Sequence, residues 1–187
     1  MASTTRARAV AVAVAALAAV AAMLAAMPAC SVVEDVLDPV HAQQVSALGG
    51  DPSGQHNGPT HRPGQPCLVC HGGLGPGRPD LSVAGTIYRT SADTQALQGA
   101  VVTLTDAQGV IRQVTTNRTG NFLVDAQTWQ PGYPLRVSVS YRGVSIDMKT
   151  HVGRDGSCAT CHTDPAGQAS AGHVYLVVDP ATFPAPP

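Results

Sequence analysis

Short runs of alternating apolar and polar residues occupy the middle of the chain, between residues 81 and 149. Apolar side chains at every second position lie on one face of a β-strand. Turn-forming sequences such as DAQG and NRTG separate the runs, as expected of strand connections. The pattern predicts six strands here and a seventh in HVYLVV, with the bounds 81–89, 100–106, 110–117, 121–125, 135–141, 144–149 and 173–178.

Seven short strands at this spacing predict an all-β fold, a small antiparallel β-sandwich. The segments on either side of the six-strand block are different. From His41 to Asp80 there are nine Gly and six Pro in forty residues, without a helical or strand period. Residues 151–172 are similarly poor in apolar side chains. Such compositions bury too little apolar surface to order themselves, so something other than side chains has to supply a core.

Both of these segments contain the same motif. A Cys-x-x-Cys-His run begins at Cys67 and recurs ninety-one positions later at Cys158. With five Cys and seven His in 187 residues, two accidental matches have a probability of roughly 1 in 100,000. The motif is the attachment signature of c-type haem, in which two cysteines form thioethers and the histidine coordinates iron. We therefore predict two haem c groups, bound covalently by Cys67, Cys70, Cys158 and Cys161, with His71 and His162 as proximal iron ligands.

Two other uses of the cysteines are open. The four cysteines of the motifs have the ligand types of a zinc site. Disulfides, or redox-active Cys-x-x-Cys pairs, are common in exported proteins. Neither explains why a histidine follows each pair. Haem also explains the composition, because two apolar macrocycles replace the missing core.

The distal iron ligands are expected among the remaining histidines. His61 and His151 precede the two motifs by six and seven residues. His56 is the alternative at the first haem, and His173 and Met148 are the alternatives at the second. Met148 alternates with apolar neighbours, which favours a place in the sandwich, and His41 is expected in a linker.

The N-terminus predicts export. Arg6 and Arg8 precede an uncharged Ala/Val-rich run from Ala9 to Met27, which is typical of a signal peptide. A retained transmembrane helix is the alternative at this length. Cys30 is the one cysteine outside the motifs, and it resembles the lipid-modified cysteine of bacterial lipoproteins; ordinary cleavage, for example after Ala42, is also open.

These expectations divide the chain into a signal peptide (1–29), a flexible linker (30–60), a first haem-binding segment (61–80), the sandwich (81–150), a second haem-binding segment (151–172), a terminal strand (173–179) and a tail (180–187). Net charge is −1 and only 12% of residues are charged. Nucleic acid is therefore not an expected partner.

The pattern VAGTIY, GAVVTLTDAQG, TTNRTGNFLV and LRVSVSYRG, over residues 83–143, resembles the transthyretin-like or carboxypeptidase-regulatory-like β-sandwich. The chain is similar to small exported dihaem cytochromes in which such a sandwich lies between two Cys-x-x-Cys-His sites. This resemblance implies a periplasmic or cell-surface protein of a bacterium, in contact with a membrane only through a lipid anchor. It also implies that other redox proteins or cytochromes are partners, and that copies of the chain can associate.

The expected function is one-electron transfer by a carrier that is not an enzyme. A dihaem peroxidase is a second hypothesis, which requires an iron with an open face and nearby acid/base side chains. A third is a binding module, in which the sandwich binds carbohydrate or protein and the haems are structural groups. Six strands between the motifs are an even number, so an antiparallel arrangement predicts both haems at the same end of the sandwich.

Overall fold

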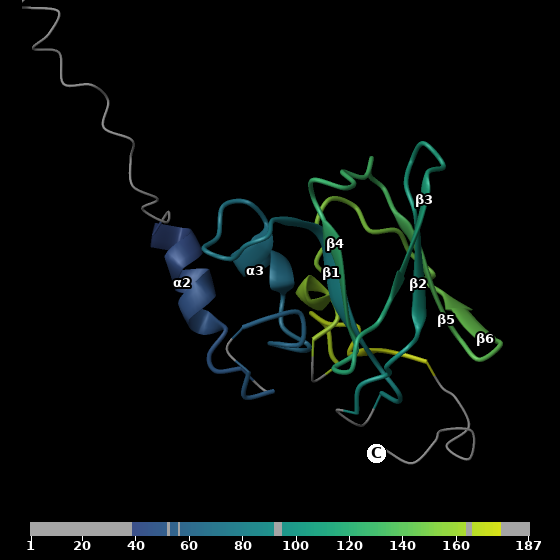
Figure 1. Cartoon of the computed structure of the whole chain (residues 1–187), viewed down its shortest axis with the longest axis horizontal. Helices are drawn as coiled ribbons and strands as arrows, with labels where there is room; N and C mark the ends of the chain where they lie inside the picture. Colours follow the sequence, from purple (N-terminus) through teal and green to yellow (C-terminus); the bar gives the residue numbers. More distant parts are fainter. Residues whose placement is uncertain (1–38, 52, 56, 92–94, 164–165, 177–187) are drawn as a thin grey trace, which may run out of the picture. The chain divides into compact units, whose positions relative to one another are not determined.

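A computed structural model describes residues 39–51, 53–55, 57–91, 95–163 and 166–176. The expected signal peptide, Cys30, His56 and the C-terminal tail lie outside the described residues. Within them the chain forms mainly β-structure (Figure 1). The strands are β1 (Leu81–Tyr88), β2 (Val101–Thr105), β3 (Ile111–Thr115), β4 (Asn121–Asp125), β5 (Arg136–Tyr141), β6 (Val144–Asp147) and β7 (Val174–Tyr175), and the helices are α2 (Pro39–Ala47), α3 (Cys67–His71) and the 3-10 turn η1 (Cys158–Thr160).

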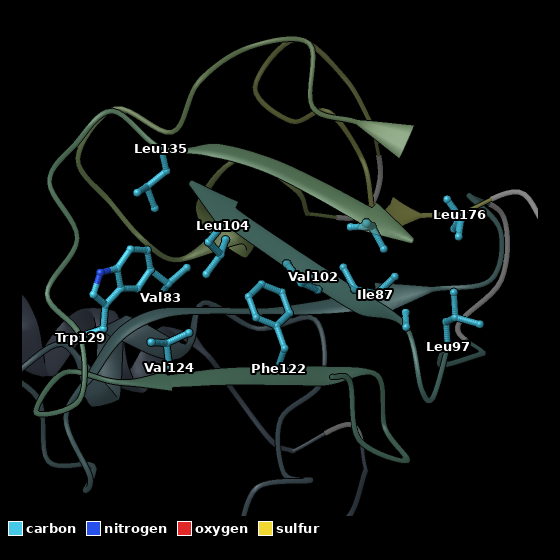
Figure 2. Close-up of a cluster of buried hydrophobic side chains, with 12 residues drawn as sticks. Val83, Ile87, Leu97, Val102, Leu104, Phe122, Val124, Trp129, Leu135 and Leu176 are labelled. Carbon is cyan, nitrogen blue, oxygen red and sulfur yellow. The ribbon is translucent and has the colours of Figure 1, made fainter. Parts of the chain in front are cut away.

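The strands form two sheets, one of three strands in the order β4-β1-β7 and one of four in the order β3-β2-β5-β6. Their inner faces enclose an apolar core, which Figure 2 shows. Phe122 and Ile87 come from the smaller sheet and Val102 and Leu104 from the larger, and each of them is at most 1% exposed. All seven predicted strands are therefore present, in a fold consistent with a small β-sandwich.

Strand β1 is buried on both faces along its whole length. Val83 and Ile87 face the core, so Ala84 and Thr86 point to the opposite, outer face, because successive side chains of a strand alternate. An outer face is usually in contact with water. Here Ala84 is fully buried and Thr86 is 5% exposed, because chain from outside the sandwich covers this strand.

Two expectations need correction. The sandwich is not antiparallel throughout, because β7 pairs with β1 in parallel, through Ile87 with Val174 and Tyr88 with Tyr175. The returning chain first makes a parallel bridge from Ser157 to Ala84 and then follows the same edge of β1 in the same direction to reach β7.

The second correction concerns the expected linker, which contains helix α2. This helix has no buried residue, so an apolar stripe could not reveal it in the sequence. Its Ala and Gln residues favour helix, and a proline at the first helical position is compatible with one. Among the described residues, none of the helices has both the length and the apolar character to cross a membrane.

Candidate haem-binding site

Each Cys-x-x-Cys-His motif folds into a single helical turn. The first motif is the whole of α3. In the second, the amides of Cys161 and His162 donate to the carbonyl of Cys158 at 3.2 and 2.9 Å. Residues three and four positions apart lie on the same face of a helical turn. The spacing therefore gives both cysteines and the histidine of a motif a common side, as a single planar cofactor requires.

The two motifs meet on β1, although ninety-one residues separate them in the sequence. Both α3 and η1 contact this strand, and Figure 1 shows them beside it. Ser157, next to η1, bridges Ala84 in the middle of β1. The two motifs thus lie on the same strand, and the pairing of the second segment with β1 brings them together. The position of both haems at one end of the sandwich stays a prediction.

A cavity of about 310 Å³ lies over the first motif, on the outer face of the β4 side of the sheet. Its volume falls at the lower end of the range for small-molecule and cofactor sites, about 300–1,000 Å³. Apolar side chains and two arginines contribute to its walls. Its lining includes Cys67, Cys70, His61, His71, Arg62 and Asn121.

His61 and His71 both line this cavity, with ring centroids 5.7 Å apart and ring planes inclined by 50°. Bonds from imidazole nitrogen to a metal such as zinc are about 2.0–2.1 Å long. The centroid separation is therefore of the order that two imidazoles bound to one metal ion require. Of the distal candidates, the structure brings His61 to the first motif, six residues from Cys67 in sequence.

Three histidines share one hydrogen-bond pattern. His71 Nδ1 donates to the carbonyl of Pro79 at 2.8 Å, and His162 Nδ1 donates to the carbonyl of Gly172 at 2.9 Å. His61 Nδ1 contacts the carbonyl of Gly58 in the same way. A carbonyl can only accept, so Nδ1 carries the proton and Nε2 keeps its lone pair. Histidines that bind metals almost always have their second nitrogen fixed like this.

The glycine-rich loop GGLGPG, residues 72–77, follows the first motif and lies against His71. A Cβ on Gly77 would lie 2.7–2.8 Å from three atoms of the His71 ring. The amide of Gly77 donates to the carbonyl of Cys70 at 2.8 Å. A glycine is therefore needed here for the close approach of the backbone to the imidazole. In the sequence, the contact of this loop with His71 was indicated only by its position immediately after the first motif.

Two of the four motif cysteines lie in apolar surroundings. Burial raises the pKa of Cys67 to about 11 and that of Cys158 to about 12. The Cys67 thiol contributes to the shift at Cys158, which indicates that the two motifs are close. All four motif cysteines are free. Across the described residues, no three His, Cys, Asp or Glu side chains are grouped to hold a metal ion.

The two cysteines of the second motif have different surroundings. Cys158 packs against the sandwich core, whereas Cys161 is exposed. His173 follows Gly172, the residue that accepts from His162, and its ring stacks on Tyr88 with centroids 4.2 Å apart. His173 is thus the remaining histidine that lies beside the partner of His162 in the chain.

The other distal candidates are not brought to a motif by a described contact. His151 is exposed and precedes Val152, which pairs with Leu135. Met148 is half-buried, and its amide donates to the carbonyl of Val137. His41 lies in α2 and not in an irregular linker.

No protein-family model, curated protein or solved structure matches the chain.

Proposed function

We propose that this protein is an exported dihaem c-type cytochrome that carries single electrons between redox partners, as the resemblance to small dihaem cytochromes implies. The observation that carries the proposal is the closeness of His61 and His71, whose ring centroids lie 5.7 Å apart at the cavity beside Cys67 and Cys70. The sequence motif supplies an attachment set and one iron ligand. A second histidine is the group that a six-coordinate iron would additionally require.

The residues present at the first site fit a haem. Cys67 and Cys70 would hold the macrocycle through thioethers, and His71 and His61 would bind the two faces of the iron. When bound, haem supplies reversible one-electron oxidation and reduction of its iron. The chain's own contribution is to orient both imidazoles through their Nδ1 hydrogen bonds and to exclude water with the cavity walls. Two histidine ligands favour a lower potential than a histidine and a methionine.

At the second site, Cys158, Cys161 and His162 would hold the other haem. His162 has the same Nδ1 hydrogen bond as His71, which supports a ligand role. His173 and His151 are the distal candidates, and the position of His173 beside Gly172 favours it. Because both motifs contact β1, we infer that the haems lie near each other and that electrons pass directly between them.

With His61 and His71 both bound to it, the first iron would have no free position for peroxide, so a peroxidase would need its open iron at the second site. Export through a signal peptide and acylation of Cys30 belong to the same proposal, since they would place the carrier at the periplasm or cell surface. Redox proteins, other cytochromes or further copies of the chain would be its partners.

The test is to produce the full chain in a bacterium that attaches haem in its periplasm, and to measure the intact mass after extraction with acidified acetone. We expect a mass that exceeds the polypeptide by two haems, and two one-electron steps in a redox titration. The double variants Cys67→Ala/Cys70→Ala and Cys158→Ala/Cys161→Ala should each lose one haem mass. Loss of all colour to the organic phase would refute covalent attachment, and rapid turnover of peroxide would favour the enzyme instead.

A further inference from the structure

The loop that carries His61 rests on two polar side chains of the sheet. Asn121, at the start of β4, donates from Nδ2 to the carbonyl of His61 at 2.9 Å and to that of Pro59 at 3.3 Å. Its Oδ1 accepts a hydrogen bond of 2.7 Å from the Thr86 hydroxyl. Thr86 Oγ1 in turn accepts from the amide of Gly64 at 2.8 Å. The pair is thus bonded to the backbone on both sides of His61 and at its carbonyl.

Both side chains are on the outer face of β1 and β4, where polar residues normally face water. Instead they are buried, with Asn121 3% and Thr86 5% exposed. Buried polar groups are costly unless they are hydrogen-bonded. Here the bonds run out of the sandwich into residues 59–64. Hydrogen bonds from the sheet therefore determine the position of that loop, in addition to packing.

The backbone next to His61 also needs such support. Arg62 has a φ of 50°, a left-handed conformation that is uncommon for residues other than Gly, Asn and Asp. Its amide donates to a carboxylate oxygen of Asp51 at 2.9 Å. Strained conformations persist where the surrounding structure over-determines them, and they concentrate at functional sites. Asn121 and Asp51 therefore bind the two polar groups of the peptide bond that follows His61, its carbonyl and the Arg62 amide.

We propose that Thr86 and Asn121 are positioning residues for the axial ligand of the first haem: they hold His61 opposite His71 so that the iron keeps two histidines. The inference rests on the proposed function, because it assumes a haem between these rings. It goes further by assigning the control of ligation to two residues of the scaffold, which belong to neither motif.

The experiment uses the full haem-loaded protein and the variants Thr86→Val and Asn121→Asp. Valine cannot accept from Gly64, and aspartate keeps the shape of asparagine but cannot donate to the carbonyl of His61. We expect both variants to carry two covalent haems, and one haem to lose its low-spin signal, as we also expect for His61→Ala. Added imidazole should restore that signal, because it replaces the displaced ligand.

Two controls isolate the role of position. Thr103→Val makes the same change on β2, where the hydroxyl accepts from Gln113 at 3.2 Å on the larger sheet, and should keep both haems low-spin. Thr86→Ser keeps the hydroxyl and should also do so. If wild-type protein lacks covalent haem, the proposed function fails. If haem is attached but both test variants, or His61→Ala, remain fully low-spin, the positioning role is wrong while the function stands.

Discussion

The substitution Gly85→Ala tests whether the second motif is packed as tightly against β1 as the structure indicates. A Cβ at Gly85 would lie 2.7 Å from Cβ and 2.8 Å from Sγ of Cys158, and 2.9 Å from the ring of Phe122. Carbon atoms in contact are normally about 3.5–4.0 Å apart. Phe122 is 1% exposed in the core, so it has little room to move. The methyl group would therefore displace Cys158.

Two effects of opposite sign set the magnitude. Replacing a glycine inside a strand by alanine normally stabilises by roughly 0.5–1 kcal/mol, because the unfolded chain loses freedom. Inserting a methyl group into a packed interior costs about 1–3 kcal/mol. The second effect is the larger here, and the expected net loss is about 1–2 kcal/mol. For a domain of this size that corresponds to a melting temperature lower by roughly 2–8 °C.

The assay is thermal unfolding of the haem-loaded protein, followed by far-ultraviolet circular dichroism, together with the intact mass. The matched control is Gly153→Ala, where a Cβ would meet nothing within 4 Å, and which should leave the melting temperature within a degree or two of the wild type. In Gly85→Ala we also expect incomplete haem attachment at Cys158. A Gly85→Ala protein as stable as the Gly153→Ala protein, with full attachment, would refute the packing argument.

Two further predictions concern the first haem and the anchor. Gly77→Ala should displace the His71 ring, because the new Cβ would lie within 2.8 Å of ring atoms. We expect it to change the low-spin spectrum or the potential of one haem only. Unchanged spectra and potentials would contradict the role of the loop. Cys30→Ala should release the protein from the membrane fraction into the soluble periplasm, as fractionation can show, and unaltered membrane association would argue against acylation.

The sequence by itself determined the strands and the attachment sets. Apolar alternation together with the turn sequences between the runs identified the strands, because successive side chains of a strand point to opposite faces. The motif spacing alone identifies Cys67, Cys70 and His71 as a set, because one helical turn brings positions three and four apart together. These are local properties, and they can be recognised without knowing what packs against them.

Only the tertiary structure decided where these parts meet. The parallel pairing of β7, the joining of both motifs on β1 and the closeness of the His61 and His71 rings all depend on contacts between distant segments. Helix α2 has no buried face, so its sequence carried no periodic signal. Asn121 and Thr86 look like ordinary outward-facing strand residues. They become part of the site because a loop from residues 59–64 covers them, and hydrogen bonds between positions about 60 and 22 residues apart leave no pattern in a single sequence.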